Sequence, residues 1–134
     1  MKKLFVLVLS LIIVAPLFTG NRAAVHAESY DFNPTKSGYV ADSHGASKNG
    51  GAAYENCAYF TPTYFSKKGT VRAYVAGGNN VKTETVDLNY GSENTTYARY
   101  YTSTSNAGGT YYLYGKVTSI SSGTSMRAKG RFTP

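Results

Sequence analysis

The residue types most suggestive of catalysis are Asp42, Ser43 and His44, because a serine, a histidine and an aspartate form the triad of many hydrolases. In a triad the three residues come from separated positions of the chain. Here they are adjacent, and neighbouring side chains of an extended chain point apart. No Gly-x-Ser-x-Gly turn accompanies them. The sequence therefore predicts no catalytic residues, and a small secreted hydrolase stays open as an alternative.

Cys57 is the only cysteine, so an internal disulfide is excluded. It could act as a nucleophile with His44, form an intermolecular disulfide, or pack as a small apolar residue. A free cysteine within an alternating segment is most often buried. We therefore predict that Cys57 is buried and unreactive.

Metal and cofactor chemistry has little support in this sequence. One cysteine and one histidine beyond residue 27 cannot make a zinc site, and the carboxylates lack the spacing of a calcium loop. Glycoside cleavage would need two carboxylates to converge, and nothing in their spacing favours this. We expect no metal and no cofactor. The candidate carboxylates are Asp31, Asp42, Glu55, Glu84, Asp87 and Glu93.

The positive charge is concentrated near the C-terminus. Residues 28–93 carry a net charge of −1, whereas residues 94–134 carry +5 and hold six tyrosines. Such a cationic, aromatic stretch favours binding of an anionic polymer or a membrane surface. The alternative is that the cations only protect sheet edges from pairing. The predicted ligand surface consists of Arg99, Lys116, Arg127, Lys129 and Arg131.

Residues 125–132 alternate between apolar and basic side chains. One face carries Met126, Ala128, Gly130 and Phe132, and the other face carries Arg127, Lys129 and Arg131. Residues on one face of a strand are about 6.6–6.8 Å apart. Three cations at this spacing repel one another unless they are solvated or face anions, so we predict an exposed basic row. Arginine suits phosphate because of its bidentate fork.

Strands must position these residues, because period-two alternation runs through most of the chain and no amphipathic helix follows residue 27. Residues 70–76 place Val71, Ala73 and Val75 on one face, and residues 81–90 place Val86, Leu88 and Tyr90 inward. These two segments form the best hairpin. Pro62 should end the strand over residues 53–60 or place it at an edge. Further strands are expected at 97–103, 110–120 and 125–133.

This spacing of strands and glycine-rich turns predicts an all-β fold. We expect a small antiparallel β-sandwich or barrel-like meander, preceded by a signal-peptide helix. Leu, Ile, Val and Phe number only 13 of the last 107 residues. Tyrosines must supply much of the buried area, since each ring buries about 150–250 Å².

The N-terminus has the features of a secretory signal peptide. Met1-Lys2-Lys3 is basic, residues 4–18 are apolar except for Ser10, and Val25-His26-Ala27 fits a small-x-small cleavage site. An apolar run of this length is too short to span about 30 Å of hydrocarbon. We predict cleavage after Ala27, secretion, and a single domain over residues 28–134. No later apolar run could cross a membrane.

Several short segments resemble a domain-of-unknown-function family of small secreted Gram-positive proteins. The layout is also similar to lactococcin-like bacteriocins, although the tryptophans typical of those proteins are absent. Neither resemblance implies catalytic residues. The segments are Ala98-Arg99-Tyr100-Tyr101-Thr102, Thr110-Tyr111-Tyr112-Leu113-Tyr114, Thr118-Ser119-Ile120-Ser121-Ser122-Gly123-Thr124 and Lys129-Gly130-Arg131-Phe132-Thr133-Pro134.

Together these features predict a secreted, non-enzymatic β-protein that binds or acts at an anionic cell-envelope surface. The expected partner is an anionic wall polymer or a membrane surface, and nucleic acid is not expected. A bacteriocin-like antimicrobial protein is the first alternative, and the small hydrolase is the second.

Overall fold

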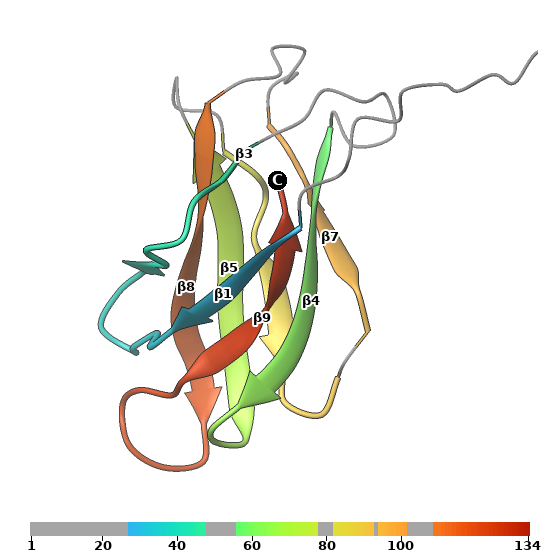
Figure 1. Ribbon diagram of the computed structural model, residues 1–134. Helices are drawn as coiled ribbons and strands as arrows, with labels where there is room; N and C mark the ends of the chain where they lie inside the picture. Colours follow the sequence, from blue (N-terminus) through green and yellow to red (C-terminus); the bar gives the residue numbers. More distant parts are fainter. Residues whose placement is uncertain (1–26, 48–55, 78–81, 93, 102–108) are drawn as a thin grey trace, which may run out of the picture.

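The computed structural model describes residues 27–47, 56–77, 82–92, 94–101 and 109–134 (Figure 1). Within these residues the protein is all-β and has no helix, which confirms the expected class. The predicted signal-peptide helix over residues 4–18 lies outside the described residues. The strands are β1 (Glu28–Phe32), β2 (Val40–Ala41), β3 (Ala46–Ser47), β4 (Cys57–Phe65), β5 (Gly69–Gly77), β6 (Val86–Asn89), β7 (Thr96–Arg99), β8 (Thr110–Ile120) and β9 (Ala128–Thr133).

The strands form two antiparallel sheets. The four-stranded sheet has the order β1-β9-β4-β7, and the five-stranded sheet has the order β2-β8-β5-β6 with β3 also paired to β8. Figure 1 shows β1 and β9 lying across β5 and β8. The sequence left two arrangements open, a sandwich and a barrel-like meander. The described residues form two separate sheets and no closed barrel.

One apolar core lies between the sheets and includes residues of both. The expected hairpin is present, since β5 pairs with β6, and Val71, Ala73 and Val75 are fully buried. The aromatic ring of Phe32 on β1 fills the space that a side chain at Gly115 on β8 would occupy. This close contact between the sheets requires a glycine at position 115.

A bulge interrupts β4 and changes which side chains point outward. Pro62 pairs with Gly130 and Tyr64 pairs with Lys129, so Thr63 is an extra residue between them. As a result Phe65 is buried and Tyr64 is 48% exposed. Pro62 does not end the strand, which continues to Phe65, but it does lie at an edge, which was the other expected outcome. The pairing of β7 with β4 stops at Phe60, so Pro62 lies on a stretch of β4 that β7 does not cover.

Two expectations about burial were wrong. Tyr90 does not point inward but is 49% exposed, because β6 ends at Asn89 and the chain turns at Gly91, whose φ is +78°. Cys57 is half-buried rather than buried, because it has the opposite orientation to its buried neighbour Ala58. It pairs directly with the exposed Arg99 of β7.

Candidate functional site

The outward side of the four-stranded sheet carries most of the predicted ligand residues. Residues paired directly across antiparallel strands share a face, and the register therefore places these side chains on one surface, which we call the cationic face. Among described strand and flanking residues it holds four cations and one carboxylate, a net charge of +3. Its members are Asp31, Tyr59, Thr61, Tyr64, Tyr97, Arg99, Arg127, Lys129 and Arg131.

The structure divides the five predicted ligand residues between the two sheets. Arg127, Lys129 and Arg131 follow one another along β9 and its entry, and Arg99 lies on β7 of the same sheet. Lys116 lies on β8 opposite Arg72, in the five-stranded sheet. The predicted single surface therefore reduces to four residues, because Lys116 belongs to the other side of the molecule.

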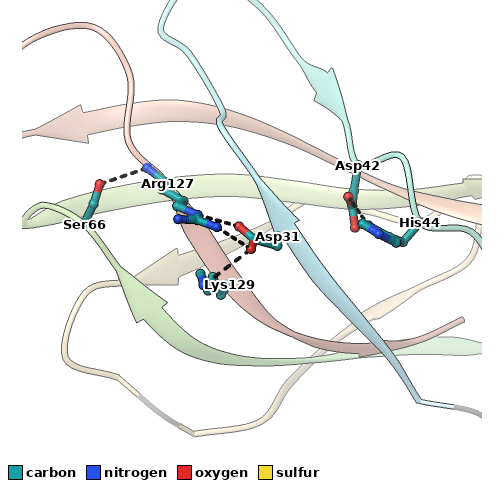
Figure 2. Close-up of polar contacts among 6 residues, drawn as sticks. All are labelled: Asp31, Asp42, His44, Ser66, Arg127 and Lys129. Atoms are coloured by element: carbon teal, nitrogen blue, oxygen red, sulfur yellow. Dashed lines mark hydrogen bonds and ion pairs between the residues drawn. The ribbon is translucent and has the colours of Figure 1, made fainter.

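Asp31 neutralises part of the basic row, as Figure 2 shows. Arg127 donates two hydrogen bonds to its carboxylate, from Nε and Nη2, each at 2.7 Å, and Lys129 Nζ lies 3.4 Å from Oδ2. The hydrogen bond from Arg127 lowers the pKa of Asp31 to about 2. The backbone N–H of Arg127 also donates to Ser66 Oγ at 2.9 Å, which fixes the entry to β9. Asp31 thus supplies a negative charge that reduces the repulsion between Arg127 and Lys129.

Arg131 and Arg99 have no carboxylate partner among the described residues. Both side chains are exposed, and no ion pair joins either to a residue that the structure describes. Thr61 pairs with Arg131 across the β4–β9 ladder. These two guanidinium groups are the parts of the cationic face most available to an external anion.

Tyrosines lie beside the cations on the same face. Tyr59 and Tyr97 are directly paired, their ring centroids are 6.2 Å apart, and Tyr97 is 54% exposed. Lys129 Nζ lies 5.8 Å from the ring centroid of Tyr64, within the range of a cation–π contact. The face thus combines positive charge with exposed aromatic area.

A groove adjoins the cationic face at the bulge of β4. Its volume is about 290 Å³, and its walls are one stretch of β4 and the turn after β6. Two half-exposed tyrosines line it, Tyr64 on the β4 wall and Tyr90 on the wall formed by the turn after β6. The sequence did not reveal the groove, because neither the bulge nor the outward turn of Tyr90 could be read from alternation. The lining residues are Pro62, Thr63, Tyr64, Phe65, Tyr90, Gly91 and Ser92.

Asp42 and His44 form a hydrogen-bonded pair, drawn in Figure 2 apart from the Asp31 cluster. His44 Nδ1 is 3.1 Å from Asp42 Oδ1, the Asp42 side chain is 1% exposed and that of His44 is 62% exposed. An aspartate that orients a histidine is one part of a triad. Ser43 makes no hydrogen bond to the pair in the described structure, and Cys57 lies on the other sheet. The pair therefore lacks a nucleophile within the described residues.

The outward side of the five-stranded sheet has an aromatic cluster of its own. Tyr74 stacks on Tyr114 with centroids 5.0 Å apart, and Tyr39 meets Tyr74 edge-on at 4.9 Å. Lys82 Nζ lies 4.2 Å from the centroid of Tyr74. Because these rings cover one another, this cluster stabilises the sheet and leaves less ring surface for a ligand. Arg72 and Asp87 form a bidentate pair nearby on the same side.

No group of three His, Cys, Asp or Glu side chains in the described part of the chain could hold a metal ion. The same residues include no helix long and apolar enough to cross a membrane. No family model, curated protein or solved structure matches this chain. The resemblance drawn from short sequence segments and the one drawn from the layout both stay predictions.

Proposed function

We propose that this protein is a secreted, non-enzymatic β-sandwich that binds anionic polymers of a cell envelope through its cationic face. The observation that carries the proposal is the pair of exposed guanidinium groups, Arg99 and Arg131, on a face of net charge +3. A guanidinium fork matches the oxygens of a phosphate and binds it through two hydrogen bonds.

The arrangement of the face supports a polymer rather than a small anion. Lys129 and Arg131 are same-face neighbours on β9, so they are about 6.6–6.8 Å apart along the strand, and Arg99 lies two strands away across β4. Cations on β9 and on β7, with β4 between them, can contact successive phosphates of a flexible chain. Each contact is exposed and screened over about 8 Å at physiological salt, so binding should be weak and salt-sensitive.

The test is retention of the protein on immobilised poly(glycerol phosphate) at low and high salt. The Arg99→Gln/Arg131→Gln variant should lose most of the salt-sensitive retention. The matched control is Lys82→Gln/Lys116→Gln, which removes the same charge from the five-stranded sheet. Equal loss in both variants would mean that net charge alone drives retention, and the proposal would then be wrong.

The same preparation tests the bacteriocin-like alternative. A binding protein should be retained on walls of intact bacteria without inhibiting their growth. Growth inhibition that survives the Arg99→Gln/Arg131→Gln change would favour the antimicrobial alternative over the proposed binding role.

A further inference from the structure

We propose that the groove between Tyr64 and Tyr90 binds a sugar unit carried by the anionic polymer. This inference rests on the proposed function and adds a specificity for glycosylated chains. It is carried by the position of the groove, which shares Tyr64 with the cationic face. A polymer whose phosphates lie on β9 would bring its substituents to this groove.

The size and lining of the groove fit one ring of a sugar. Its volume of about 290 Å³ is at the lower end of the range for small-molecule pockets, about 300–1,000 Å³. Two phenol rings, a proline and a phenylalanine form part of its lining. The negative face of an aromatic ring attracts C–H groups such as those on the flat side of a pyranose.

The polar groups of the groove are hydroxyls. Thr63, Ser92, Tyr64 and Tyr90 each bring one, and no charged side chain is among the described residues that line the groove. A hydroxyl both donates and accepts hydrogen bonds, which matches the hydroxyls of a sugar. A phosphate would need a cation in the groove, and a nucleobase is usually read by Asn, Gln, Arg or acidic side chains. None of these is among its described lining residues, whose hydroxyls and rings favour a sugar over either.

Both tyrosines are available to a ligand. Tyr64 and Tyr90 are 48% and 49% exposed, and Tyr90 makes no ring contact with another described aromatic side chain. The backbone holds their positions. Tyr64 is set outward by the bulge in β4, and the N–H of Tyr90 donates to Gly69 O at 3.0 Å. The groove thus has fixed walls and two half-exposed rings.

The experiment compares binding of the full protein to poly(glycerol phosphate) with and without glucosyl substituents. The wild type should bind the glucosylated polymer about threefold to tenfold more tightly, because one contact with an aromatic ring contributes about this much to binding. Tyr90→Ala and Tyr64→Ala should both abolish this preference. Tyr90 lies outside the cationic face, so Tyr90→Ala should keep the salt-sensitive binding of the bare polymer. Tyr90→Phe should retain the preference because the ring remains.

Tyr101→Ala is the matched control, since Tyr101 is 67% exposed and follows β7 at the far end of β4. It should leave the preference unchanged. Equal binding of the two polymers by the wild type would overturn the sugar site and leave the proposed function standing. No binding of either polymer would overturn both. Tighter binding of a single-stranded oligonucleotide than of the glucosylated polymer would assign the groove to a base and overturn the inference.

Discussion

Replacing Asp31 by Asn should strengthen polymer binding, because Asp31 is the one carboxylate among the described members of the cationic face. Its oxygens accept two hydrogen bonds from Arg127 at 2.7 Å and lie 3.4 Å from Lys129 Nζ. Asparagine keeps the size of the side chain and removes the charge. The net charge of the face rises from +3 to +4, and two cations become free to meet phosphates.

The magnitude follows from counterion release. One or two additional phosphate contacts steepen the dependence of log K on log salt by about 0.7–1.4, using the slope for a flexible single strand. Between about 50 and 200 mM salt the variant should therefore lose about threefold to sevenfold more affinity than the wild type. At the lowest salt it should bind more tightly than the wild type.

The assay is a titration of poly(glycerol phosphate) at several salt concentrations. Asp87→Asn is the matched control, because Asp87 accepts the same bidentate pair from Arg72 on the five-stranded sheet. The control should change the slope much less. An equal gain in both variants, or weaker binding by Asp31→Asn, would refute the role assigned to the cationic face.

The Asp31 pair also has a pH signature. The folded protein lowers the pKa of Asp31 from 3.8 to about 2. A group with a lowered pKa stabilises the fold above its unfolded pKa, and this contribution is lost as the pH falls through the folded value. The stability difference between the wild type and Asp31→Asn should be small, since the pair is exposed. It should be nearly constant above about pH 4, fall as the pH approaches 2, and be lost below about pH 2.

Three other substitutions test the packing. Gly130→Ala should lower the free energy of unfolding by about 1–3 kcal/mol, because a Cβ there would meet the Tyr30 hydroxyl and the Thr61 carbonyl oxygen. Gly38→Ala, with open space around it, should be nearly neutral in the same denaturation assay. Tyr30→Phe should stabilise the fold by about 1 kcal/mol, because the buried hydroxyl of Tyr30 has no partner in the described structure. A variant less stable than the wild type would contradict this expectation. Cys57 should react with a thiol reagent in the native state, since it is half-buried and faces outward. Labelling that occurs only after unfolding would contradict this accessibility.

Alternation predicted the faces of several strands correctly. Met126, Ala128 and Phe132 are buried, and Arg127 and Arg131 are exposed, as expected for the segment 125–132. The longest expected strand, 110–120, has the bounds of β8. These predictions held because each of these strands has one side on a single core, so burial enforces period two along its length.

The same rule could have predicted the Asp42–His44 contact. If adjacent side chains of an extended chain point apart, those two positions apart lie on the same side. Asp42 and His44 are related in this way, and their side chains are hydrogen-bonded. The adjacency of the three triad residue types argues against Ser43 as a partner of His44, but not against the pair itself.

Other features depend on contacts that no local pattern contains. Asp31 and Arg127 are 96 residues apart, and they meet because β1 and β9 are neighbours in the four-stranded sheet. The sequence predicted an exposed basic row, solvated or facing anions, but did not indicate that Asp31 would be one of those anions. Similarly, Lys116 was grouped with the other cations by its position in the chain, whereas the strand order places it on the opposite sheet.

The departures from regular alternation are also where the surface becomes concave. A bulge bends its strand and re-aims a side chain, so it can form one wall of a groove on a sheet. Here the extra residue Thr63 turns Tyr64 outward on one wall, and the turn at Gly91 exposes Tyr90 on the other. β4 pairs with β9 and β7, which carry the cations, and its bulge forms one wall of the groove. The position of that wall relative to the cations is therefore set by β4, which is the arrangement that the proposed binding of two parts of one polymer requires.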